Sequence, residues 1–229
     1  MWRMAALALL AVAACGAPEF DPGEIDDDGS DSSSDAEAGS SDAGASRSDS
    51  GGTPTNPSTT AGLTAQQVAQ KIVASGKVRP LPNAVNYYPQ IVDIADGKTV
   101  PDCGIDIRIL KLIFKLTEKY NSVGISDINR KCTQVMIGGG TTGSHWVNGG
   151  GGAVDFWRMN DTNLNGSNAI NVEMVTYAGT FMPDGTRFGQ SNCRTSAGTT
   201  VDLPGMKQFS DSCNHQHIDV SSTDAPFKD

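Results

Sequence analysis

Residues 16–62 contain almost no large apolar side chain, which confines any folded part of the chain to residues 63–229. The segment consists mainly of Ser, Gly, Asp and Ala, so it cannot bury enough apolar surface to offset the entropy lost in folding. It carries 11 acidic residues and one basic residue, Arg47, whereas residues 63–229 carry 15 of each. We therefore expect an acidic, disordered segment followed by one domain without the basic excess that attracts nucleic acid.

The first residues have the composition of an export signal. Arg3 precedes an apolar run over residues 4–14, which is too short to cross a bilayer as a helix. Two alanines then precede Cys15, an order that resembles a bacterial lipobox, in which the cysteine is lipidated. The sequence predicts a lipoprotein signal peptide at 1–14 and a membrane anchor at Cys15. A tether over 15–62 would then link this anchor to an exported domain; an ordinary secretory signal is the alternative.

The domain contains an even number of cysteines, which in an exported protein favours two disulfides. They are Cys103, Cys132, Cys193 and Cys213. No C-x-x-C pair is present, which argues against a thiolate zinc site, and three pairings are open. We favour Cys193–Cys213, because these residues flank a segment that leads directly into a histidine pair, and with it Cys103–Cys132.

Hydrophobic spacing predicts three helices. Their expected ranges are 63–75, with Thr64 as N-cap, 106–124, ended by Gly124, and 168–181. The lysines of the second helix, Lys111, Lys115 and Lys119, lie off its apolar stripe. The proline-rich segment 80–103 is expected to be irregular, with one short strand at most.

Short alternating segments predict strands in the second half of the domain. Their expected ranges are 123–130, 132–140, 151–159, 186–193 and 215–222. Helices early and strands late indicate an α+β fold, with helices packed on an antiparallel central sheet, rather than a βαβ arrangement.

All three histidines fall in two motifs that suit a metal site. "GSHWVNGGGGAVDF" contains His145 and Asp155, and "CNHQHIDV" contains His215 and His217. On a strand, alternate side chains share a face, so His215, His217 and Asp219 would point the same way. Two histidines and one carboxylate leave the fourth tetrahedral position for water, as in a catalytic zinc site. The glycine runs lack the Gly-Lys-Ser/Thr ending of a phosphate loop.

These motifs resemble those of the zinc D-Ala-D-Ala carboxypeptidase and murein endopeptidase superfamily, which shares its fold with the Hedgehog signalling domain. That superfamily carries Ser-x-His-x-x-Gly-x-Ala-x-Asp, followed late in the chain by His-x-His or acid-x-x-His. The "SDINR" segment is similar to its Ser-Gly-Tyr-Arg segment, and the resemblance covers roughly residues 106–220. It implies a Zn²⁺ ion and a peptidoglycan stem peptide as substrate. The implied residues are His145, Asp155 and His217 as zinc ligands, His215 as the catalytic or oxyanion-stabilising histidine, and Arg130 facing the substrate.

Three features depart from the family pattern. The interval between His145 and Asp155 is three residues longer, Ser144 directly precedes His145, and Asn214 replaces the usual acidic base. Catalysis would therefore depend on His215, and Asp211 and Asp219 are weaker candidates for the base.

We expect a monomeric zinc peptidase in the periplasm or at the cell surface. The sequence leaves open whether it is a carboxypeptidase or an endopeptidase. Arg130, Arg158 and Arg187 are equally available to bind a substrate carboxylate. Two other interpretations stay open. One is a non-catalytic zinc module of the same fold that binds the cell wall, and the other is a metal-free structural lipoprotein held by disulfides.

Overall fold

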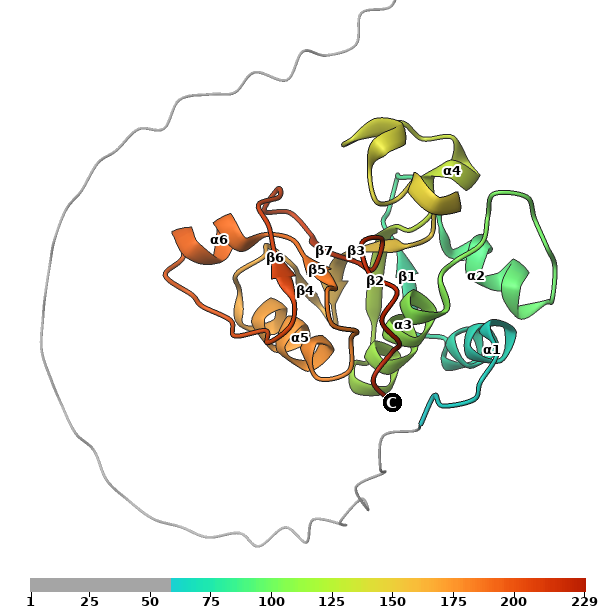
Figure 1. The fold of residues 1–229 in the computed structure, drawn as a ribbon, viewed down its shortest axis with the longest axis horizontal. Coiled ribbons are helices and arrows are strands. Elements are labelled where there is room, and N and C mark those ends of the chain that lie inside the picture. The colour runs from blue at the N-terminus through green and yellow to red at the C-terminus, as the bar shows by residue number, and fades with distance from the viewer. Residues whose placement is uncertain (1–58) are drawn as a thin grey trace, which may run out of the picture. The chain divides into compact units, whose positions relative to one another are not determined.

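The computed structural model describes residues 59–229. The expected signal peptide at 1–14, the lipidation site Cys15 and most of the tether at 15–62 lie outside the described residues. A seven-stranded sheet runs through the domain in the order β1-β2-β3-β7-β5-β6, with β4 paired to β3 (Figure 1). The strands are β1 Val78–Pro80, β2 Val123–Asp127, β3 Ala153–Met159, β4 Thr162–Asn163, β5 Arg187–Phe188, β6 Lys207–Gln208 and β7 Gln216–Asp219. The helices are α1 Ala65–Ser75, α2 Tyr88–Ala95, α3 Ile107–Lys119, α4 Arg130–Thr133, α5 Ala169–Gly179 and α6 Ser191–Ser196, with 3₁₀ turns η1 Gly140–Thr142 and η2 Val147–Gly149.

The sheet is mixed, so the expected antiparallel sheet describes only its centre. The strand β3 is antiparallel to β2, β4 and β7, and β7 is antiparallel to β5. The pairs β1–β2 and β5–β6 are parallel. A parallel pair needs a long crossover, and here α2 and α3 connect β1 to β2 while α6 connects β5 to β6. The fold is therefore a mixed α and β architecture that is compatible with the α+β class.

The helices that the sequence predicts form where their caps and apolar stripes place them. Thr64 caps α1 in a capping box with Gln67, and Asp106 caps α3. In Figure 1, α1, α2 and α3 gather beside β1 and β2, and α5 and α6 lie at the other end of the sheet. The fully buried apolar residues of α3 anchor the core between helices and sheet; they are Ile109, Leu110, Leu112, Ile113 and Leu116.

The sequence predicted that Gly124 would end α3, but Gly124 lies inside β2. The helix ends at Lys119, with Tyr120 as its C-cap. A Cβ atom on Gly124 would stand 2.7 Å from Trp157 Nε1, so this glycine permits the close approach of β3.

Two other expectations are wrong. Segment 80–103 contains a helix, α2, because Pro89 stands in its first turn, where the missing N–H costs no hydrogen bond. Segment 132–140 forms no strand, because Asn129 accepts a hydrogen bond from Cys132 N and caps the short helix α4. The strand expected over 186–193 is confined to β5, and α6 follows it.

Two disulfides are present, Cys103–Cys132 and Cys193–Cys213, the pairing favoured from the sequence. Stable disulfides indicate a non-reducing, exported environment. Within residues 59–229, none of the helices has the length and apolar character needed to cross a membrane.

The two ends of the described chain meet beside α3. Thr60 is fully buried, and its backbone N–H donates to Asp229 Oδ1 at 3.2 Å. Lys111 Nζ lies 2.6 Å from the other carboxylate oxygen of Asp229. Lys111 and Lys115 are both buried, although they lie off the apolar stripe of the helix.

Candidate metal centre

The pairing of β3 with β7 brings Asp155 opposite His217. Residues directly opposite on paired strands project to the same face, and His217 Nδ1 lies 2.8 Å from Asp155 Oδ1. The neighbouring residues Val154, Phe156 and Ile218 project to the other face and are fully buried in the core. The alternation that builds the core thus presents a carboxylate and an imidazole together on the opposite face.

His145 joins this pair from the loop between η1 and η2. Its Nδ1 lies 2.6 Å from the carbonyl oxygen of Ile128, which can only accept, so Nδ1 carries the proton. The other ring nitrogen, Nε2, lies 3.2 Å from Asp155 Oδ2 and 3.3 Å from His217 Nδ1. The hydrogen bond from Nδ1 to Ile128 therefore orients the ring so that Nε2 faces the cluster.

The glycine run before Asp155 has a packing function. Gly150 has a φ of +76°, and a Cβ there would stand 2.0 Å from Asn129 Oδ1. The Asn129 amide donates to the carbonyl oxygens of Asp102, Gly104 and Gly149. The run thus lets the chain close tightly around Asn129 on its way from His145 to β3.

The far side of the His217 ring is held by buried polar groups. Nε2 donates to Asp219 Oδ2 at 2.9 Å and lies 3.2 Å from Ser144 Oγ. Asp219 is fully buried and is held in turn by Arg187 and Ser221. Asp219, expected as a weaker candidate for the base, instead stands behind His217.

The cluster fits a metal ion. His145, Asp155 and His217 are all buried, and each offers a ligand atom within 4.8 Å of the others. In a tetrahedral site with zinc–nitrogen bonds of about 2.0–2.1 Å, neighbouring ligand atoms stand about 3.4 Å apart. His145 Nε2 lies 3.2 Å from Asp155 Oδ2 and 3.3 Å from His217 Nδ1, which is close to this value, and His217 Nδ1 lies 2.8 Å from the other oxygen, Oδ1. Two imidazole nitrogens and a carboxylate oxygen are also a donor set that zinc accepts.

Charge is balanced tightly in the buried cluster. Burial alone raises the pKa of the Asp155 carboxyl, but His145 and His217 outweigh it and hold that pKa well below its usual range. Burial lowers the pKa of His217, yet Asp155 and Asp219 outweigh it and raise that pKa to about 9. Burial opposes the effect of His217 on Asp219, whose pKa is nevertheless lowered to about 2. The carboxylates thus hold a positive charge at this position.

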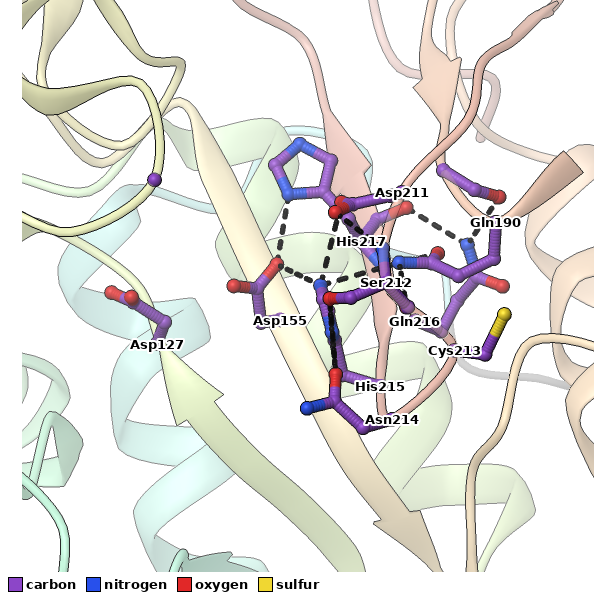
Figure 2. Close-up of polar contacts among 12 residues, drawn as sticks. Asp127, Asp155, Gln190, Asp211, Ser212, Cys213, Asn214, His215, Gln216 and His217 are labelled. Atoms are coloured by element: carbon purple, nitrogen blue, oxygen red, sulfur yellow. Dashed lines mark hydrogen bonds and ion pairs between the residues drawn. The ribbon is translucent and has the colours of Figure 1, made fainter. Parts of the chain in front are cut away.

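The cluster opens into a cleft of about 1020 Å³. His215 lines the cleft, with Nε2 at 3.6 Å from Asp155 Oδ1 and 3.5 Å from Asp211 Oδ2. Its Nδ1 lies 2.7 Å from Asn214 Oδ1. Figure 2 shows Asp155 on β3, with His215, His217 and Asp211 gathered on its β7 side. Because β7 begins at Gln216, the expected alternation on one strand holds for His217 and Asp219, and His215 reaches the cleft from the residue before the strand.

Arg130 also lines the cleft, but its guanidinium is held by the protein. It forms an ion pair with Asp127, and Nη1 donates to the carbonyl oxygens of Ile137 and Gly138. Its Nη2 lies 3.4 Å from Asp155 Oδ2. Burial raises the pKa of Asp127, against the influence of His145 and Arg130.

The three arginines left open by the sequence differ in position. Arg130 and Arg187 line the cleft, whereas Arg158 is absent from its lining and contacts Asp161. The Arg187 guanidinium forms an ion pair with Asp219, and the Arg187 side chain is partly exposed.

Sequence reasoning missed three residues that support the site. Asp127 and Asn129 lie in the "SDINR" segment together with Arg130. Their closeness in sequence to Arg130 could have marked them as candidate site residues. No sequence pattern pointed to Gln190. Its Oε1 accepts a hydrogen bond from His217 N at 2.9 Å, and its backbone has a φ of +64°, a conformation set by tertiary packing.

Comparisons of the chain with protein-family models, with curated proteins and with solved structures found no match. The geometry of this cluster therefore carries the functional assignment.

Proposed function

We propose that this protein is a zinc-dependent peptidase that hydrolyses stem peptides of peptidoglycan. One observation carries the proposal: His145, Asp155 and His217, from separate parts of the chain, converge in a buried cluster at a cleft that also contains His215. Metal-assisted hydrolysis needs such a convergence of imidazoles and carboxylate, whereas a groove that binds peptide without a metal does not.

Zinc in such a site supplies Lewis-acid polarisation of a carbonyl and a water of lowered pKa. His215 is the proton acceptor in this proposal. Because Asn214 Oδ1 accepts from Nδ1, the lone pair on Nε2 is the one left near Asp155. Arg130 holds Asp127 and stands beside Asp155, so it positions that ligand and adds positive charge to the cleft wall.

The substrate class comes from the resemblance of "SHWVNGGGGAVDF" and "HQHIDV" to the zinc D-Ala-D-Ala peptidase superfamily, whose Hedgehog-like fold we propose for this chain. A disulfide-containing exported domain supports this assignment. With a lipid anchor at Cys15, a monomeric domain of this kind would meet peptidoglycan at the bacterial envelope.

A second candidate is a zinc-containing module that binds cell-wall peptide without cleaving it. Asn214 favours it, because an amide that accepts from His215 Nδ1 stands where a carboxylate base is expected.

Zinc analysis followed by digestion of purified muropeptides separates the two. We expect about one zinc per chain, peptide or D-alanine release, and loss of release with a chelator. His217→Ala should lose the zinc, whereas His215→Ala should keep it and lose turnover by about 10²–10⁴-fold. The matched control is Asp161→Asn, because the Asp161 side chain is fully exposed. Zinc and muropeptide binding without any release would establish the binding module instead.

A further inference from the structure

We infer that Arg187 binds the free C-terminal carboxylate of the peptide substrate, so that the enzyme removes the last residue of a stem peptide. The inference rests on the proposed function, because it names the end of the substrate that the cleft accepts. It selects one of the three arginines that the sequence left equivalent, and it favours a carboxypeptidase over an endopeptidase.

The cleft offers few cations to a substrate. Two arginines line it, and within residues 59–229 its lining includes no lysine. Arg130 has no nitrogen left for a new partner, because Nε pairs with Asp127, Nη1 donates to two carbonyl oxygens and Nη2 lies beside Asp155. Its side chain is 11% exposed. Arg187 is therefore the cation of the cleft wall that can accept an anion.

Asp219 fixes one edge of the Arg187 guanidinium and leaves the other edge open. Nε lies 3.1 and 3.0 Å from the two oxygens of Asp219, and Nη2 lies 3.0 Å from Oδ2. Among residues 59–229, no group accepts a hydrogen bond from Nη1. Asp219 is fully buried and absent from the cleft lining, whereas Arg187 lines the cleft and its side chain is 35% exposed. The open edge thus faces the cleft, with the fork of N–H groups that binds a carboxylate through two hydrogen bonds.

Arg187 stands beside a candidate metal ligand. It pairs with Asp219 across β5 and β7, and Asp219 follows His217 by two residues on the same strand face. Asp219 Oδ2 accepts from His217 Nε2 at 2.9 Å and from Arg187 Nε at 3.0 Å. The ring of Phe209, which also lines the cleft, lies 5.4 Å from the His217 ring and 5.2 Å from Arg187 Cζ. The guanidinium and the imidazole therefore border the same part of the cleft wall.

This arrangement suits a cut at the last peptide bond. A residue of extended peptide spans about 3.3–3.6 Å, so the terminal carboxylate lies one such length beyond the carbonyl that is cleaved. With that carbonyl at the cluster that contains His217, the carboxylate falls on the side of Arg187. A peptide that continued further would place a neutral amide against the guanidinium and lose the charge-assisted hydrogen bonds.

The test compares two peptides on the full-length protein at saturating zinc: a stem peptide that ends in D-alanine, and the same peptide with an amidated C-terminus. Turnover gives kcat/KM for each peptide. Calorimetric titration in the His215→Ala background gives each dissociation constant without cleavage. We expect wild type to prefer the acid over the amide by about 10–100-fold, the range for a hydrogen bond between charged groups.

Arg187→Gln should bring this ratio near one by lowering the value for the acid alone, whereas a purely structural function of Arg187 would lower both values and keep their ratio. Arg187→Lys is the second variant, because it keeps a positive charge beside Asp219. It should lower the ratio part of the way, since one ammonium group lacks the fork that binds two carboxylates. The matched control is Arg158→Gln, which should keep the wild-type ratio. The Arg158 side chain is also 35% exposed and pairs with an aspartate, but it lies outside the cleft lining.

A wild-type ratio near one, or a ratio that is unchanged in both Arg187 variants, overturns the inference. Absence of turnover with either peptide contradicts the proposed function instead. The dissociation constants then decide the role of Arg187, because a preference for the acid that Arg187→Gln abolishes still shows that this residue binds the carboxylate.

Discussion

Asp219 supports the candidate metal centre from behind His217. It accepts from His217 Nε2 at 2.9 Å, and Arg187 and Ser221 hold its two oxygens. A buried carboxylate in this position fixes the tautomer and orientation of the imidazole that it contacts. In β7, the candidate ligand His217 is therefore followed two residues later by Asp219, the group that orients its ring.

Asp219→Asn should weaken zinc binding by about 10–100-fold, the range typical of such supporting residues. The side chain keeps its shape but loses the charge that favours the imidazole as a ligand. Competition with a chromophoric chelator measures the zinc dissociation constant, and Asp161→Asn serves as the exposed control. An unchanged dissociation constant would show that Asp219 supports only the strand.

At the scale of single residues, the family resemblance implied His145, Asp155 and His217 as one set, and strand alternation, a local property, predicted that His217 and Asp219 share a face. Asn129 and Gln190 could not be found this way. Asn129 donates to carbonyl oxygens of residues 102, 104 and 149, which only the folded chain brings together.

The start of α3 shows how one residue links an element to the rest of the domain. The Asp106 carboxylate accepts from Arg108 N at 2.8 Å and pairs with the Arg108 guanidinium at 2.6 Å. The same guanidinium donates to the carbonyl oxygens of Thr223 and Ala225 in the C-terminal segment. Asp106 thus caps the helix and orients the arginine that holds this segment.

Asp106→Asn should lower the free energy of unfolding at neutral pH by about 0.5–1.5 kcal/mol, a typical value for one such interaction. Burial alone raises the pKa of Asp106, but Arg108 outweighs it, and the folded-state pKa lies below the usual 3.8. Its stabilisation is therefore complete above the unfolded-state pKa and is lost as pH falls through the folded-state pKa. Urea unfolding of both proteins at neutral pH and near pH 2–3 should show the difference shrinking in acid. A difference that is independent of pH would assign the effect to capping geometry and not to charge.

Elements with a local signal were predictable and those shaped by tertiary contacts were not. Helix α1 has a capping box, and β3 and β7 alternate clearly. Gly124 follows an apolar helical stripe and therefore suggested a terminator, yet its function is to admit Trp157 from β3. The parallel pairing of β1 with β2 was also hidden, because the sequence does not show which distant strand will lie alongside.

Metal binding should couple to the stability of the whole domain. A ligand that binds only the folded state stabilises it by about 2.7 kcal/mol at a concentration 100-fold above its dissociation constant. For a domain of this size, each kcal/mol corresponds to roughly 2–4 °C in Tm.

We therefore expect a chelator to lower the Tm of wild-type protein by roughly 5–10 °C relative to zinc-saturated protein. His217→Ala should melt at the same temperature with and without zinc. Differential scanning calorimetry measures both, with the disulfides kept intact. A wild-type Tm that does not respond to zinc would argue against a tight site.

The meeting of Thr60 with Asp229 bears on how this domain could be rebuilt. A short peptide joining these positions would close the polypeptide into a ring without crossing the sheet. New termini could then be opened at the exposed turn around Gly198, which lies after α6 and between the two motifs in chain order. Such a circular permutant would keep β3 and β7 paired while changing which of the two motifs is synthesised first, so the order of the motifs along the chain is separable from the site that they form.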